Sequence, residues 1–139
     1  MKITPWLLVL SLACLSACST TAGGERDESA GADTQTVLVT YYVKPGKDAE
    51  LQAVLAQAWE LYRKEHLVLD QPHVIVRHNE PGDKTRLVEI FTWVSHSAPG
   101  RAPDSVKAIW NQEHSLCSAP EGHSGIEGGE VDLLVPTHH

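Results

Sequence analysis

Apolar and polar side chains follow two periods along the chain, and each change of period marks a predicted element. Residues 36–44 (TVLVTYYVK) are β-branched and aromatic, which is typical of a strand, and a Pro-Gly pair at 45–46 ends it. Residues 47–66 carry apolar side chains three and four positions apart, which predicts an amphipathic helix. The apolar stripe of this helix comprises Leu51, Val54, Leu55, Ala58, Leu61 and Tyr62.

The second half of the chain continues with short elements between turn signals. Residues 73–78 (HVIVRH) and 86–94 (RLVEIFTWV) predict two strands, and the Glu-Pro-Gly-Asp turn at 80–83 joins them as a hairpin. A second helix is predicted from residue 103 to residue 117, and residues 125–135 supply a last strand. The order β-α-β-β-α-β predicts an α+β, ferredoxin-like fold with both helices on one face of the sheet.

The third strand is apolar on both of its faces. Leu87, Phe91 and Trp93 share one parity, whereas Val88, Ile90 and Val94 share the other. A sheet covered by helices on one face only should alternate apolar with polar residues. The second face therefore needs a cover, and we expect a homodimer whose sheets pack face to face.

The N-terminus has the features of an export signal. Lys2 supplies a positive charge, and residues 6–15 form an apolar core that is too short to span a membrane as a helix. The run from Leu15 to Cys18 (LSAC) resembles the lipobox of bacterial lipoproteins, which implies cleavage after residue 17 and lipidation of Cys18. Plain secretion with an incidental cysteine is the alternative. Ser19 after the lipidated residue favours sorting to the outer membrane, so we expect an envelope protein that faces the periplasm.

The predicted organisation is a signal peptide (1–17), a lipidated cysteine and tether (18–35), one domain (36–135) and a short tail (136–139). With 18 acidic and 11 basic side chains in 139 residues and no basic stripe, the chain lacks the features of a nucleic-acid partner. Of its 3 cysteines, Cys14 leaves with the signal and Cys18 carries lipid. Cys117 is then the one remaining thiol, a buried apolar residue or, in the alternative, a reactive nucleophile.

Residues 37–134 resemble the antibiotic-biosynthesis-monooxygenase-like domains of the dimeric α/β-barrel superfamily. The resemblance rests on the motif KPGK at 44–47, on EIFTW at 89–93 and on the second helix from VKAIW at 106–110 to residue 117. It implies a dimer with a pocket between helices and sheet, where an aromatic substrate reacts with O₂ and needs no metal or other cofactor. Haem-degrading relatives use an asparagine on the first strand, which residues 36–44 lack.

Two candidate acid or base residues lie on the second helix. Glu113 falls near the centre of the apolar arc of that helix, so its carboxyl points at the sheet and burial would raise its pKa. The alternative is an ion pair between Glu113 and an arginine. His114 lies at the edge of the arc, where it either transfers protons or is half exposed.

The hairpin supplies the other candidates. Glu89 and Arg77 share a sheet face if the strands pair residues of equal parity, either as a base and an anion clamp or as a structural pair. His73 shares that face and would flank the same pocket, or it bonds a backbone carbonyl at the strand end.

Aromatic side chains complete the candidate site. We expect Trp93 and Trp110 to be pocket walls and Tyr42 to be a further substrate contact, with core or dimer packing as the alternative. The 8 histidines include no H-x-x-x-H pair, and no C-x-x-C pair occurs, so a metal site is not predicted.

Three functions fit these observations. The first is a lipid-anchored, dimeric domain that binds a small apolar or aromatic molecule and oxygenates it without a cofactor. The second is a binding or sensing module of the envelope without catalysis. The third is an envelope scaffold whose shared sheet is its only use.

Overall fold

The computed structural model describes residues 33–134. The predicted signal peptide, Cys18, nearly all of the predicted tether and the tail at 136–139 lie outside these residues. Among the described helices, none is both long and apolar enough to cross a membrane.

The elements follow the predicted order β-α-β-β-α-β, with a short 3-10 helix (Pro99–Arg101) before the second helix. Their bounds are β1 Gln35–Val43, α1 Asp48–Lys64, β2 Val68–Glu80, β3 Lys84–Trp93, α2 Asp104–Leu116 and β4 Ile126–Glu130.

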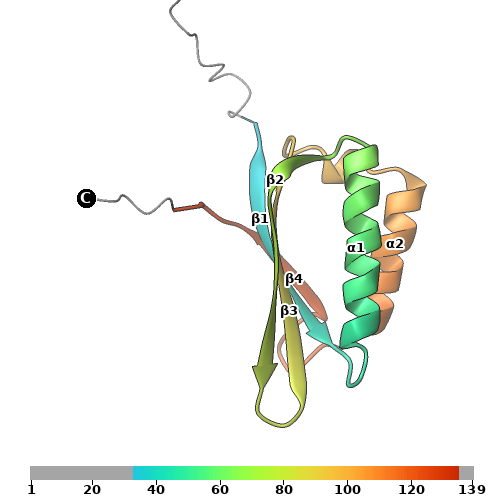
Figure 1. The fold of residues 1–139 in the computed structure, drawn as a ribbon, viewed down its shortest axis with the longest axis vertical. Coiled ribbons are helices and arrows are strands. Elements are labelled where there is room, and N and C mark those ends of the chain that lie inside the picture. Colours follow the sequence, from blue (N-terminus) through green and yellow to red (C-terminus); the bar gives the residue numbers. More distant parts are fainter. Residues whose placement is uncertain (1–32, 135–139) are drawn as a thin grey trace, which may run out of the picture.

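The four strands form one antiparallel sheet in the order β2-β3-β1-β4. Both helices lie against the same face of this sheet (Figure 1). Within residues 33–134, no helix covers the opposite face of the sheet. This arrangement confirms the α+β, ferredoxin-like prediction. We call the two sides of the sheet the helix face and the open face.

Local chemistry explains the first turn and helix. β1 ends before Pro45 and Gly46, and Gly46 has the positive φ of 74° that glycine adopts without strain. Acidic side chains occupy the first turn of α1 and basic ones its last turn, which complements the helix dipole. The inward side of α1 is buried along its length and comprises Leu51, Val54, Leu55, Ala58, Trp59 and Tyr62.

Two strand bounds differ from the prediction. β2 begins at Val68, upstream of the predicted residue 73, because Val68 already pairs with Trp93, and the register shifts between Val68 and His73. Pro72 lies in this irregular stretch, where the ladder needs no N–H donor. β4 ends at Glu130 because its partner β1 begins at Gln35, and the last backbone hydrogen bond runs from the Val131 N–H to the Thr36 carbonyl.

The two faces of β3 are both apolar, as predicted, but they differ in exposure. Leu87 and Phe91 are buried under the helices, whereas Val88 and Ile90 on the open face are partly exposed. Val94 lies just beyond the strand and packs against the core, so it does not extend the open face.

Apolar side chains of three strands form a connected patch on the open face. In register, Val76 lies beside Val88, and Val74, Ile90 and Leu38 lie side by side across β2, β3 and β1. Val74 is 46% exposed and Val76 is 49% exposed in the single chain. We call these five residues the open-face patch.

Candidate functional site

A buried carboxylate on the helix face is the centre of the candidate site. Glu89 of β3 is 1% exposed, and both of its oxygens have a partner. The Tyr41 hydroxyl donates to Oε2 at 2.9 Å, and Nε2 of His73 lies 2.9 Å from Oε1. The Trp59 ring of α1 stacks on the His73 ring with centroids 3.7 Å apart. We call Glu89, His73 and Tyr41 the Glu89 network.

The electrostatic state of this network follows from its burial. Burial raises the pKa of Glu89, and the hydrogen bonds from His73 and Tyr41 act in the opposite direction. Burial and the neighbouring Glu89 also raise the pKa of Tyr41 well above its ordinary value. Tyr41 therefore keeps its proton and acts as a hydrogen-bond donor.

A second buried carboxyl lies on α2. Glu113 is 4% exposed, and its Oε1 atom has no hydrogen-bond partner within the described residues. Burial, followed by the charge of Glu89, raises the pKa of Glu113 to about 8. No arginine in the described part of the chain forms an ion pair with Glu113, so that predicted alternative is not what the structure shows.

Aromatic rings surround this part of the helix face. The Trp93 ring lies edge-on to Trp110 with centroids 6.5 Å apart and lies 5.3 Å from the Tyr62 ring. The indole N–H of Trp110 donates to the Tyr62 hydroxyl. Burial and then Glu113 raise the pKa of Tyr62, so this hydroxyl is neutral. Trp93 and Trp110 thus lie together on the face that also holds both carboxyls.

Arg77 does not pair with Glu89, and the predicted Glu89–Arg77 pair is wrong. Arg77 shares the helix face, but it lies opposite Leu87, and its guanidinium reaches Asp48 at 3.2 Å and Gln52 at 3.2 Å. Arg77 can make these contacts because the first residues of α1 lie beside it. On Glu89, the oxygen Oε1 is already bonded to His73 of the same strand β2.

The two candidate histidines have different positions. His73 bonds Glu89 and not a backbone carbonyl, so it lies beside the buried carboxylate of the candidate site. His114 is exposed on α2, so its position agrees with the second of its two interpretations.

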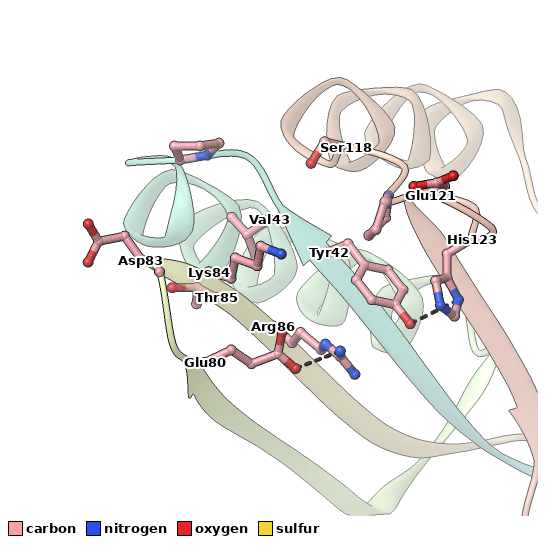
Figure 2. A pocket seen from close by; sticks show the side chains of 13 residues that line it. Tyr42, Val43, Glu80, Asp83, Lys84, Thr85, Arg86, Ser118, Glu121 and His123 are labelled. Carbon is pink, nitrogen blue, oxygen red and sulfur yellow. Dashed lines mark hydrogen bonds and ion pairs between the residues drawn. The ribbon is translucent and has the colours of Figure 1, made fainter.

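Tyr42 is the predicted contact that the structure places elsewhere. It lies opposite Arg86 on the open face, whereas its neighbour Tyr41 points toward the helices. A pocket of about 610 Å³ lies beside Tyr42 (Figure 2). The placement of Tyr42 in the site between helices and sheet is therefore wrong.

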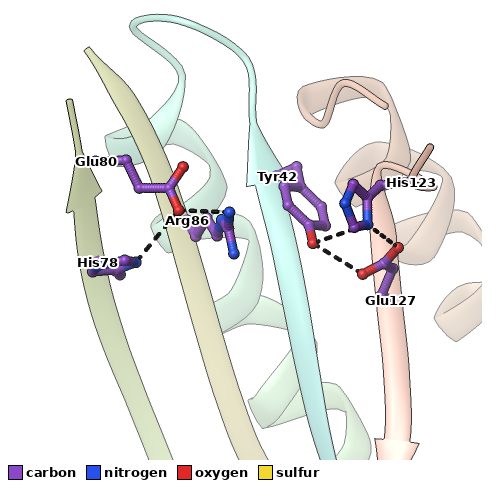
Figure 3. Close-up of polar contacts among 6 residues, drawn as sticks. All are labelled: Tyr42, His78, Glu80, Arg86, His123 and Glu127. Atoms are coloured by element: carbon purple, nitrogen blue, oxygen red, sulfur yellow. Dashed lines mark hydrogen bonds and ion pairs between the residues drawn. The ribbon is translucent and has the colours of Figure 1, made fainter. Parts of the chain in front are cut away.

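A row of polar side chains crosses the open face at this pocket (Figure 3). The Tyr42 hydroxyl donates to Oε2 of Glu127 at 3.0 Å, and Nδ1 of His123 lies 2.9 Å from the other oxygen of Glu127. These bonds lower the pKa of Glu127. On the β3 side, Arg86 forms an ion pair with Glu80, and its guanidinium carbon lies 4.9 Å from the centre of the Tyr42 ring.

Sequence reasoning missed Tyr41 and Tyr62 as site residues. The sequence pattern places Tyr62 in the apolar stripe of the first helix, which predicts only that it is buried. Its hydroxyl contact with Trp110 depends on how α1 and α2 pack. The position of Tyr41 could have been predicted. β1 and β3 pair odd-numbered residues with odd-numbered residues, so Tyr41 lies on the same face of the sheet as Glu89.

The last two candidate features are the Cys117 thiol and a metal site. Cys117 is buried, and burial raises the pKa of its thiol to about 11, which makes it a poor nucleophile near neutral pH. Between residues 33 and 134, no group of three His, Cys, Asp or Glu side chains is arranged to hold a metal ion.

No protein-family model and no curated protein sequence matches the chain. Solved structures do match it. SnoaB from Streptomyces nogalater, a cofactor-independent oxygenase, is 20% identical with a TM-score of 0.56, covering 76% of this chain and 97% of that chain. A proposed antibiotic biosynthesis monooxygenase from Caulobacter crescentus is 15% identical with a TM-score of 0.54, covering 74% of this chain and 92% of that chain.

A proposed antibiotic biosynthesis monooxygenase from Nitrosomonas europaea is 14% identical with a TM-score of 0.53, covering 76% of this chain and 95% of that chain. At these identities the similarity shows the fold, and the fold alone does not establish an activity.

The raised pKa of Glu113 predicts a pH-dependent stability. The folded chain holds this proton up to about pH 8, whereas the unfolded chain releases it near pH 4.5. The unfolded state binds fewer protons between these values, so the free energy of unfolding falls as pH rises through them. Relative to Glu113→Gln, we expect the wild type to lose up to about 4 kcal/mol between pH 5 and pH 9 in urea denaturation.

The exposed Glu60→Gln variant on α1 is the matched control and should follow the wild type at every pH. Parallel pH curves for wild type and Glu113→Gln would contradict the assignment of a buried, protonated Glu113.

Proposed function

We propose that this chain binds a small aromatic molecule between its helices and sheet and oxidises it with O₂, without a metal or flavin. The observation that carries the proposal is the pair of buried carboxyls, Glu89 and Glu113, on a face walled by aromatic rings. Their surroundings are unequal, and this inequality assigns an acid and a base.

Glu89 is suited to be the base of the pair. It accepts hydrogen bonds from Tyr41 and His73, and both bonds stabilise its carboxylate form. His73 lies between Glu89 and the Trp59 ring, so a proton taken at Glu89 has a neighbouring imidazole that can share it.

Glu113 is suited to be the acid. Among the described residues, no donor is bonded to its Oε1 atom to stabilise a negative charge, and Glu89 already carries a negative charge nearby. Two carboxyls in a site of low polarity divide into one that ionises and one that keeps its proton. A protonated Glu113 can donate a hydrogen bond to an oxygen that gains negative charge on the substrate.

The reaction fits a substrate with an acidic methylene between two aromatic rings and opposite a ketone, as in anthrone. Removal of one proton by the base gives an electron-rich anion, which transfers an electron to O₂ and then forms a C–O bond. The resulting hydroperoxide loses water. The balance is CH₂ plus O₂ to C=O plus H₂O, and all four electrons come from the methylene carbon. Trp93 and Trp110 would exclude water from the reacting anion.

The comparisons support the proposal by analogy alone. SnoaB has the same fold and is a cofactor-independent oxygenase, but its low identity transfers no residue roles to this chain. A second candidate is a binding module without catalysis. It is favoured by the complete hydrogen bonding of Glu89, because a carboxylate with both oxygens occupied is also what a purely structural network requires.

We also propose that two copies of the chain assemble through the open-face patch. Apolar side chains that are almost half exposed on a strand lose unfavourable contact with water when a second sheet covers them. The lipid anchor at Cys18 and the position at the outer membrane, facing the periplasm, are part of the same proposal and rest on the sequence from Leu15 to Ser19.

Oxygen consumption tests the catalytic proposal. With anthrone and the full chain, we expect catalysed O₂ uptake that Glu89→Gln reduces about 100-fold or more in kcat, since a positioned base contributes at least this factor. The exposed Glu121→Gln variant is the control and should keep the wild-type rate. Wild-type activity in Glu89→Gln would contradict the base assignment. Saturable quenching of tryptophan fluorescence by anthrone, without O₂ uptake in any variant, would favour the binding module.

Sedimentation equilibrium tests the dimer. The wild type should sediment with twice the mass of one chain, and Val76→Asp should sediment as one chain because it places a charge within the patch, at its most exposed position. Gln57→Asp, an exposed change on the outer side of α1, should leave the dimer intact. A wild type that sediments as a single chain would contradict the proposal.

Metabolic labelling with palmitate in a bacterial host tests the anchor. The wild type should be labelled and found with the membranes, whereas Cys18→Ser should be unlabelled, because acylation takes place on that thiol. Cys14→Ser is the matched control and should be labelled like the wild type. Label retained in Cys18→Ser would show that the anchor prediction is wrong.

A further inference from the structure

The pocket beside Tyr42 lies on the opposite side of the sheet from the Glu89 network. Three connections that are distant in the sequence meet around it: the β1–α1 loop with Pro45, the β2–β3 turn with Gly82, and the α2–β4 loop with Pro120. Its volume of about 610 Å³ lies within the range of small-molecule sites, which is about 300–1,000 Å³.

One wall of this pocket is cationic. Lys84 and Arg86 of β3 both line it, and Figure 2 shows the Lys84 ammonium turned inward, whereas the neighbouring Asp83 carboxylate points outward. Within residues 33–134 no carboxylate forms an ion pair with Lys84, so its charge is unpaired in this part of the chain. The Nε atom of Arg86 is a buried donor without an acceptor among the described residues.

Four carboxylates lie in or beside the pocket, and two of them, Glu80 and Glu127, have partners. Glu80 is neutralised by Arg86, and Glu127 accepts hydrogen bonds from Tyr42 and His123. Glu121 lies on the far wall beside His123, across the pocket from Lys84 (Figure 2). The ammonium of Lys84 and the unpartnered Nε of Arg86 are thus both on the β3 side. Asp83 is on this side as well, but its carboxylate points away from the pocket, and Glu121 is on the other side.

The remaining lining suits an apolar body. Pro45, Pro120 and the Tyr42 ring offer flat hydrocarbon surfaces, and Thr85 and Ser118 are small neutral neighbours. Arg86 and the His123 ring flank Tyr42, with the imidazole centroid 5.3 Å from the phenol centroid, and so hold its orientation. A site that combines a cation with flat apolar walls recognises an acid carried on a flat body.

We propose that the pocket beside Tyr42 is a second ligand site, for a small organic carboxylate with a flat apolar body. The carboxylate lies against Lys84 and the guanidinium of Arg86, and the body lies between Pro45 and Pro120 along the edge of Tyr42. This site is separate from the Glu89 network and does not depend on the oxygenase proposal.

Three probes separate charge from shape. Benzoate has the proposed features, benzamide has the same shape without the charge, and inorganic phosphate has charge without an apolar body. In NMR titrations of the full chain, benzoate should saturate and shift the amide signals of Thr85, Arg86 and Ser118. Lys84→Gln should weaken benzoate about fivefold, the upper value for one exposed ion pair.

Two controls make each result decisive. Lys107→Gln removes an exposed charge on α2 that is remote from the pocket, and Glu89→Gln alters the other site, so both should bind benzoate like the wild type. Equal affinity for benzamide, equal affinity for phosphate, or signal changes centred on Trp93 and lost in Glu89→Gln would each overturn the proposal. Absence of saturable benzoate binding would overturn it as well.

Discussion

The register between β1 and β3 determines which side chains of this chain meet. Tyr41 lies opposite Leu87, and Tyr42 lies opposite Arg86, so two adjacent tyrosines serve opposite sides of one sheet. One hydroxyl binds a buried carboxylate beneath the helices, and the other binds a partly buried carboxylate beside a pocket. A slip of one residue would exchange every contact of both groups, which makes this pairing the constraint on which both sites depend.

The cost of the buried carboxyls is offset unequally. Glu89 obtains two hydrogen bonds in exchange for lost hydration, and the side chains that provide them come from β1 and β2 on either side of it. Oε1 of Glu113 has no such partner between residues 33 and 134, so the favourable state of this carboxyl is the neutral acid. An unsatisfied buried carboxyl reduces the stability of a small domain, and sites that bind or react with a ligand are where such costs are usually found.

Much of the fold was predictable from the sequence, and the site was predictable in part. The order of elements follows from changes of period, two of which lie at Pro45 and Pro103, and the burial of Glu113 follows from its angle on α2. Strand parity placed Glu89 on the helix face. Glu89 pairs with His73 and not with Arg77. This outcome depends on how far each side chain extends along the sheet and on where α1 begins, and strand parity predicts neither. The pocket beside Tyr42 is formed by three loops that are distant in the sequence, so no local sequence pattern predicts it.

The two outer strands of the sheet are unlike each other. β2 is long and interrupted, with Pro72 in its irregular part and charged side chains near its far end. Proline and charge on an outer strand discourage another polypeptide from adding to it through backbone hydrogen bonds. β4 has 5 residues, which limits the edge that it offers, but its Gly128 and Gly129 present no bulky side chains to an incoming strand. Unwanted polymerisation of this domain, when it occurs, is therefore expected to start at β4.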